Sequence, residues 1–145
     1  MKRFSLAAIL VAAILAPLAG QGSARAASIL ARIDISEQSM TVFVDGRRTA
    51  RWPVSTARRG YRTPIGTFRP GRMYKRYFSK KYHGSPMPHS VFFYGGYAIH
   101  GTNAIRSLGR PASHGCIRLH PENARRLFSM IKRHGKRNAR IVITR

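Results

Sequence analysis

The sequence has only one cysteine and four acidic residues among its 145 residues. The lone cysteine, Cys116, excludes a disulfide within the chain, so it is a nucleophile, a metal ligand or a small buried apolar side chain. The four acidic residues stand against 27 lysines and arginines, and the formal net charge is +23. Such a charge bears on partners and solubility rather than on the fold.

Long hydrophobic runs are also scarce. An apolar run at residues 4–18 follows a short positive segment and precedes an A-x-A pattern at residues 24–26. The run is shorter than the roughly 20 residues that a spanning helix needs. This layout is typical of a secretory signal peptide cleaved after Ala26. We therefore predict a signal peptide at residues 1–26 and one domain at residues 27–145.

Export to the periplasm or cell envelope decides which partners are expected. The mature chain has a net charge of 24 − 4 = +20 and no integral membrane span. The segment from Gly71 to His89 is rich in lysine, arginine and tyrosine, a composition that could bind nucleic acid through stacking and phosphate contacts. Because export removes nucleic acid as a partner, we expect an anionic cell envelope instead, and a solvated or lid-like loop at this segment.

Alternating apolar residues predict several short strands. Ile29, Ala31, Ile33 and Ile35 fall on one face of a first strand, and residues 40–44 repeat the alternation. Asp45-Gly46 predicts a hairpin turn, with the chain returning over residues 47–54. Residues 63–68, residues 90–101 (divided by two glycines) and the terminal ARIVITR also contain β-prone pieces. The pattern predicts a mainly β domain.

One segment has helical rather than β periodicity. Ala124, Leu127, Phe128 and Ile131 form the apolar stripe of an amphipathic helix in HPENARRLFSMIKRHG. Proline and glutamate suit its first turn, three basic residues occupy its last turn, and a glycine follows. The sequence therefore predicts one prominent helix, which starts just after the stretch containing Cys116.

The surroundings of Cys116 are suited to covalent catalysis. A thiol attacks a carbonyl as thiolate, so it needs a nearby base or positive charge. His100 ends a predicted strand and could act as that base, while Arg110 and Arg118 add positive potential. Gly115, directly before the thiol, lets the backbone approach a substrate. The amides of Gly115 and Cys116 could then face a developing oxyanion.

Two other roles for Cys116 remain open from the residues alone. Cys116, His120, His100 and His114 could together bind a tetrahedral zinc ion. The paired spacings usual for zinc sites are missing, and His120 directly precedes the predicted helix, where it serves as a cap or faces solvent. Cys116 could also be a buried structural residue with incidental histidines.

Two sequence blocks resemble the L,D-transpeptidase catalytic domain, also called the YkuD domain. IHGTNAIRSLGRPASHGCIRL (residues 99–119) is similar to the family signature, a histidine-glycine pair followed at a distance by S-H-G-C. VSTARRGYRTPIGTF (residues 54–68) is similar to a second recurrent block with a T-P-x-G turn. The resemblance covers most of residues 28–145 and implies a β-sandwich-type catalytic domain.

The resemblance also implies roles for particular residues. Cys116 corresponds to the nucleophile and His100 to the general acid and base, while His114 and Gly115 line the oxyanion site. Arg118 is implied to bind a substrate carboxylate, and Gly101 and Ser113 to be further substrate-binding residues. Many family members have serine or threonine where this chain has Gly101, which can offer only its backbone carbonyl to His100.

The implied activity is acyl transfer on peptidoglycan tetrapeptide stems through a cysteine thioester, without metal or cofactor. The amine acceptor would be another stem, giving a cross-link between third residues, or the end of an envelope protein. Two alternatives are an L,D-carboxypeptidase, with water as acceptor, and a non-catalytic basic domain that binds peptidoglycan.

Overall fold

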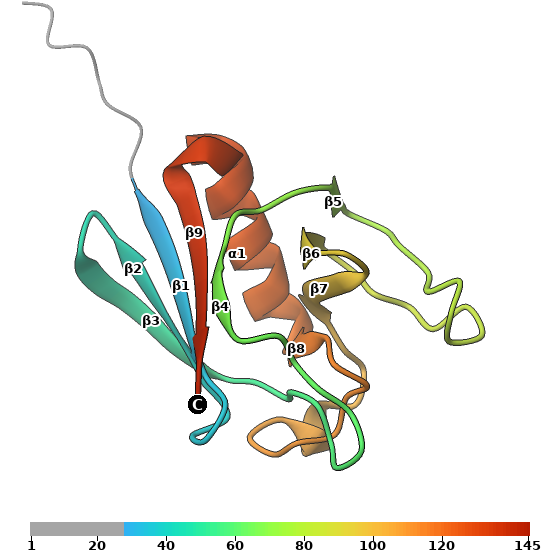
Figure 1. Cartoon of the computed structure of the whole chain (residues 1–145). Helices are drawn as coiled ribbons and strands as arrows, with labels where there is room; N and C mark the ends of the chain where they lie inside the picture. The colour runs from blue at the N-terminus through green and yellow to red at the C-terminus, as the bar shows by residue number, and fades with distance from the viewer. Residues whose placement is uncertain (1–27) are drawn as a thin grey trace, which may run out of the picture.

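The computed structural model, which describes residues 28–145, has nine short strands in two sheets and one α-helix that packs against both (Figure 1). The first sheet has the strand order β3-β2-β1-β9-β4. Its strands are β1 (Ile29–Asp34), β2 (Ser39–Val44), β3 (Arg47–Pro53), β4 (Gly66–Phe68) and β9 (Ala139–Thr144). The predicted signal peptide lies outside the described residues.

Hydrophobic alternation decides which face of the first sheet is buried. Ile29, Ala31 and Ile33 on β1 are at most 2% exposed, as predicted. β1 pairs antiparallel with β2 and parallel with β9, and β2 pairs antiparallel with β3 across the predicted Asp45-Gly46 turn. The first and last strands within residues 28–145 are therefore neighbours in the same sheet.

The second sheet has the order β5-β6-β7-β8 and holds the segments that carry the candidate site. Its strands are β5 (Met73–Tyr74), β6 (Ser90–Tyr94), β7 (Tyr97–Gly101) and β8 (Ile117–Leu119). β6 and β7 form a hairpin at the predicted pair of glycines. β7 and β8 pair in parallel, and this register sets His100 opposite Arg118.

Helix α1 (Pro121–His134) matches the predicted amphipathic segment. Its buried residues are Ala124, Leu127, Phe128 and Ile131, the four of the predicted apolar stripe. His120 is the N-cap, and its Nδ1 accepts a hydrogen bond from the Glu122 amide at 3.3 Å. At the other end, Gly135 takes φ +86° and donates its N–H to the Ile131 carbonyl.

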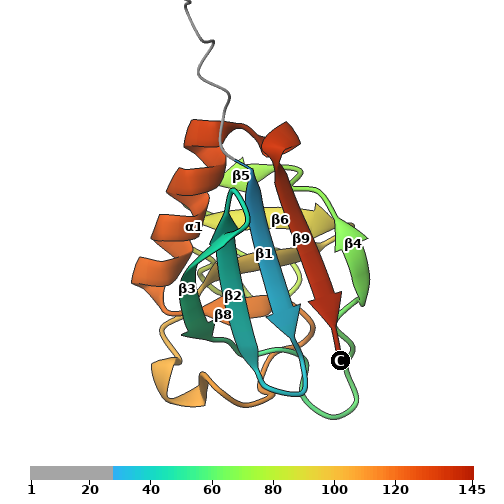
Figure 2. The same cartoon turned by 90° about the vertical axis from the view of Figure 1, so that its left-hand side faces the viewer.

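One hydrophobic core joins both sheets and the helix. It includes residues of β1, β2 and β9 from the first sheet, β6, β7 and β8 from the second, and the apolar stripe of α1. Figure 2 shows α1 along one side, with strands of the second sheet crossing behind those of the first. The expected fold class, a mainly β sandwich-type domain with one prominent helix, is confirmed.

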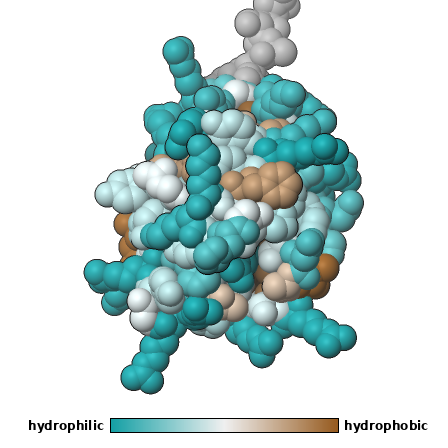
Figure 3. All heavy atoms as spheres, turned by 90° about the vertical axis from the view of Figure 1, so that its right-hand side faces the viewer, coloured by the Kyte–Doolittle hydropathy of each residue, from teal (hydrophilic) through white to brown (hydrophobic). Residues whose placement is uncertain are grey.

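The segment from Gly71 to His89 contains only the two-residue strand β5, and the rest of it is loop. The loop projects at the right of Figure 1. The face on that side is mostly hydrophilic, with separate apolar patches (Figure 3). Within residues 28–145, no helix has both the length and the apolar character needed to cross a bilayer.

Candidate active site

A cavity of about 300 Å³ opens between the long loop and the second sheet. Its walls come from loop residues 79–87, from the end of β7 with the residues that follow it, and from residues 113–118. The lining residues are Ser79, Tyr82, Ser85, Pro86, Met87, His100, Thr102, Asn103, Ala104, Ser113, His114, Cys116 and Arg118. The structure thus brings together five sequence-predicted site residues and the expected lid-like loop.

The parallel pairing of β7 and β8 places Cys116 and His100 in the same cavity. Cys116 is half-buried and directly precedes β8, whereas His100 is buried on β7. His100 Nδ1 lies 2.7 Å from the carbonyl oxygen of Gly101. A carbonyl can only accept, so Nδ1 carries the proton and Nε2 remains available as a proton acceptor. Gly101 therefore orients His100 through its backbone carbonyl.

The surroundings favour the neutral forms of both groups. Burial lowers the pKa of His100 to about 4, opposed by its hydrogen bond to Gly101 and assisted by the charge of Arg118. Burial also raises the pKa of the Cys116 thiol, opposed by a hydrogen bond from the backbone of Ala98 and by the charges of Arg118 and Lys81. At neutral pH the cavity holds a thiol and an imidazole rather than an ion pair.

A tight turn at Gly115 presents Cys116 to the cavity. Gly115 has φ +130°, and a Cβ there would lie 2.5 Å from the Tyr97 ring and 2.7 Å from the Arg62 carbonyl oxygen. The Ser113 hydroxyl accepts from the Gly115 amide at 3.0 Å and donates to the Cys116 carbonyl at 2.6 Å. Only glycine fits this position, because any side chain meets backbone on one side and a tyrosine on the other.

The surroundings of three predicted site residues bear on the roles expected for them. The Gly115 amide already donates to Ser113, so of the two amides expected to face an oxyanion only that of Cys116 is a candidate donor. The proton of the Ser113 hydroxyl is committed to the Cys116 carbonyl, which makes this side chain a support for the turn. Gly101 is buried between Pro88 and Pro121 and is not among the residues that line the cavity.

His114 lies at the rim in an aromatic and cationic setting. Its ring stacks on Tyr82 of the long loop, with centroids 4.5 Å apart and an interplanar angle of 14°, and meets Tyr61 edge-on at 4.6 Å. Arg58 Nη2 lies 2.9 Å from His114 Nε2 and is the donor, since arginine stays protonated. The pKa of His114 is lowered by partial burial and by Arg58, Arg118 and Lys81.

Arg118 reaches the cavity from β8 and is half-buried. Its Nη1 donates to the Ala112 carbonyl at 3.3 Å, and its backbone pairs with Ser55 on the connection after β3. Because the guanidinium keeps donors that this single contact does not use, it can bind an anion inside the cavity.

The zinc alternative lacks a ligand set in the described chain. No three of the His, Cys, Asp and Glu side chains within residues 28–145 come close enough together to bind one ion. His120 caps α1, and the Nε2 of His114 accepts a hydrogen bond from Arg58.

Three residues of the site were not singled out in the sequence. Arg58 and Thr63 belong to the block at residues 54–68, which was noted for its turn alone, and Tyr82 belongs to the long loop. The Thr63 hydroxyl donates to the Gly115 carbonyl at 2.9 Å and accepts from the Ala57 amide at 3.0 Å. The T-P-x-G pattern was a signal for Thr63, but no local pattern indicated that it contacts residue 115.

The proteins that this chain resembles in sequence or in fold include several L,D-transpeptidases. YkuD of Bacillus subtilis (strain 168), named as a candidate L,D-transpeptidase, is 27% identical over 68% of this chain and 58% of its own. An L,D-transpeptidase from Mycobacterium smegmatis has a TM-score of 0.72 and 26% identity, covering 82% of this chain and 59% of that one. Another from Mycobacterium tuberculosis H37Rv has a TM-score of 0.74 at 20% identity. The match covers 82% of this chain and 58% of that one, and it shows likeness of fold.

The chain spans less than two thirds of the length of these relatives. The family model of the L,D-transpeptidase catalytic domain (YkuD) matches residues 28–143, nearly all of the described chain. The resemblance seen in the two sequence blocks is thus confirmed, and the protein belongs to the YkuD family of L,D-transpeptidase catalytic domains.

Proposed function

We propose that this chain is an exported cysteine acyltransferase that cleaves the L,D bond of peptidoglycan tetrapeptide stems and transfers the acyl group to an amine. The observation that carries the proposal is the shared cavity of Cys116 and His100, with His100 Nδ1 held by Gly101 and Nε2 left as acceptor. Membership of the family supports the reaction class.

The chemistry proceeds in two transfers. His100 Nε2 takes the thiol proton as Cys116 Sγ attacks the carbonyl carbon of the third stem residue. The oxyanion that forms is stabilised by the Cys116 amide, and its collapse expels D-alanine, whose nitrogen receives the proton from His100. An acceptor amine then gives a proton to His100 and attacks the thioester. The new amide bond forms as the C–S bond breaks, and His100 returns the proton to the leaving Cys116 sulfur, which restores the thiol.

The neutral resting state fits general-base catalysis. A thiol with a raised pKa and an imidazole with a lowered one are both uncharged at neutral pH. Proton transfer therefore accompanies the attack on substrate instead of preceding it. Arg118, inside the cavity, is the candidate partner for the terminal carboxylate of the stem.

The test uses the mature chain with a disaccharide tetrapeptide and mass spectrometry. We expect release of D-alanine, a mass increase on Cys116 and linked dimers. Cys116→Ala should abolish all three, and His100→Ala should lower the rate at least a hundredfold, since positioned acid–base groups contribute about 10²–10⁴. His120→Asn, which alters only the helix cap, is the matched control. A wild-type chain that forms no adduct on Cys116 would refute the proposal.

The product identifies the acceptor. Linked dimers indicate an amine acceptor on a second stem, whereas a free tripeptide with no dimer indicates water and hence a carboxypeptidase. A non-catalytic basic domain would release no D-alanine from any stem, and Cys116→Ala would leave its binding to peptidoglycan unchanged. That binding would weaken with salt, because exposed charges are screened.

A further inference from the structure

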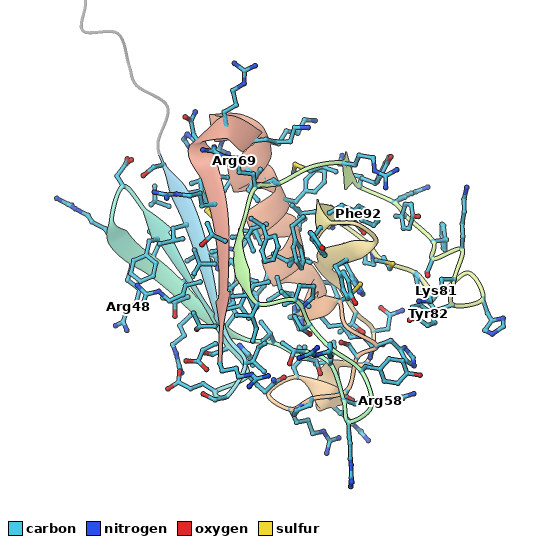
Figure 4. The ribbon with its side chains drawn as sticks, in the orientation of Figure 1. Arg48, Arg58, Arg69, Lys81, Tyr82 and Phe92 are labelled. Carbon is cyan, nitrogen blue, oxygen red and sulfur yellow. The ribbon has the colours of Figure 1, made fainter. Side chains whose placement is uncertain are left out.

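The mouth of the cavity carries two cations in addition to Arg118. Arg58 lies on the connection between β3 and β4, and Lys81 lies on the long loop beside Tyr82 (Figure 4). Arg58 contacts His114, and the Arg58 guanidinium also lies 5.1 Å from the Tyr61 ring centre. Lys81 Nζ lies 5.5 Å from the ring centre of Tyr82, which stacks on His114. Arg58 thus contacts the imidazole directly, whereas Lys81 lies next to the tyrosine that stacks on it.

The positive charges of these three residues shift the pKa values of groups in the cavity. Arg118 and Lys81 both lower the pKa of the Cys116 thiol, and Arg58, Arg118 and Lys81 all lower that of His114. The three cations therefore produce a positive potential that reaches the cavity.

Neither of the two ion pairs within residues 28–145 involves Arg58, Lys81 or Arg118. The cavity lining contains no acidic residue. All four acidic residues of the chain are used in local contacts elsewhere: Glu37 with Arg51, Glu122 with Arg125, Asp34 with Ser36, and Asp45 with Ser28. Within residues 28–145, then, Arg58, Lys81 and Arg118 have no acidic side chain within ion-pair distance. A bound anion would relieve their mutual repulsion.

The separation of the cations suggests two anionic groups on one ligand. Arg118 lies inside the cavity with Cys116, whereas Arg58 and Lys81 lie outside its lining, beyond His114 and Tyr82. A peptide whose reacting carbonyl is at Cys116 could place its terminal carboxylate near Arg118 and a second carboxylate at the mouth.

We propose that Arg58 and Lys81 form a second carboxylate site, which selects stem peptides whose internal carboxylates are free over stems in which they are amidated. The inference rests on the proposed function for the identity of the peptide. It adds a specificity that family membership does not assign. Both cations are exposed, so each contributes a factor of up to about five in affinity.

Two synthetic tetrapeptide stems test this site. One has free carboxylates on its second and third residues, and the other has carboxamides there. Both keep the terminal carboxylate, so the contribution of Arg118 is the same for each. Acylation of Cys116 is followed by intact mass, and binding to the Cys116→Ala protein is followed by calorimetry.

The wild-type chain should prefer the free stem by about tenfold in kcat/KM. The Arg58→Gln/Lys81→Gln double variant should lose most of that preference, measured as the ratio of kcat/KM between the two stems, because any effect through Cys116 or His114 acts on both stems alike. Arg59→Gln/Lys80→Gln removes the same charge from neighbouring positions and should keep the preference. Equal use of both stems by the wild type, or an equal loss on both stems in the Arg58/Lys81 variant, would overturn the proposal.

The two readouts separate this inference from the proposed function. Acylation of Cys116 without a preference refutes the carboxylate site alone. If neither stem acylates Cys116, the proposed function fails. The affinities of the Cys116→Ala protein then still test whether Arg58 and Lys81 select the free carboxylates.

Discussion

At the scale of single residues, Cys116 and His100 are kept neutral by the structure around them. Burial is the main cause for both: it raises the pKa of the thiol and lowers that of the imidazole. The Gly101 carbonyl fixes which nitrogen of His100 carries the proton. The same carbonyl is available whatever side chain residue 101 has, which explains how glycine can stand at this position. A Cβ at residue 101 would lie 3.1 Å from both Pro88 and Pro121, so a side chain there requires a small shift of these neighbours.

The raised pKa of the thiol predicts slow alkylation of Cys116 at neutral pH. The rate of modification by iodoacetamide should rise with pH through a pKa above the ordinary value of 9.0. Only the thiolate reacts, and burial disfavours it. An unfolded peptide with the sequence ASHGCIRLH is the control and should titrate lower. Alkylation that has already reached its maximum at pH 7 would contradict the prediction.

The turn at Gly115 predicts a stability difference between two glycine substitutions. Gly109→Ala, at φ +89° with nothing within 4 Å of the new Cβ, should cost only backbone strain, about 1 kcal/mol. Gly115→Ala adds overlap with Tyr97 and the Arg62 carbonyl, so it should cost about 3 kcal/mol or more. Urea unfolding measures both. Equal losses would show that the overlap is relieved by movement of the neighbours.

At the scale of elements, the site depends on two segments that flank the stretch containing Cys116. The connection after β3 pairs with it through the bridges Ser55–Arg118 and Ala57–Ser113. The long loop meets it from the other side through the Tyr82–His114 stack. The first contact uses backbone hydrogen bonds, whereas the second uses this aromatic pair and the packing of Met87 in a small hydrophobic cluster that includes Cys116. The loop is therefore the more easily opened wall of the cavity.

The aromatic contact predicts that Tyr82→Ala opens the loop. A pair of this kind contributes about 0.5–1.5 kcal/mol, so hydrogen exchange of loop amides should quicken by about two- to tenfold. Acylation of Cys116 should slow, because one cavity wall is lost. Phe78→Ala is the matched control: Phe78 is on the same loop, 61% exposed, and does not line the cavity. Similar exchange in both variants would argue against a role for the stack.

At the scale of the whole molecule, basic residues far outnumber acidic ones, and the four acidic residues make contacts with nearby side chains or backbone. Within the described chain there are two ion pairs, both between exposed side chains. Such pairs add little to stability, so the hydrophobic core shared by the two sheets and α1 carries the fold. Stability should consequently respond weakly to protonation of carboxylates. It should respond more strongly to protonation of the buried His100.

His100 predicts a loss of stability in mild acid. Its pKa is about 4 when folded and 6.5 when unfolded, so the unfolded chain binds more protons between these values. The free energy of unfolding should therefore have its full value above pH 6.5. It should decrease by about 3 kcal/mol as the pH is lowered from 6.5 to 4. His100→Gln should remove most of this slope in urea unfolding. A slope of equal size in that variant would assign it to other groups.

The sequence by itself determined the features that depend on neighbouring residues. Local periodicity predicted the apolar stripe of α1, the alternation on β1 and the hairpin at Asp45-Gly46. Side-chain chemistry predicted that Cys116 and His100 act together as nucleophile and base. The tertiary structure decided how distant segments meet. It set His100 opposite Arg118, used the Gly115 amide for Ser113, and brought Arg58 and Tyr82 to His114. Most of these contacts join residues far apart in the chain, and no local pattern specifies them.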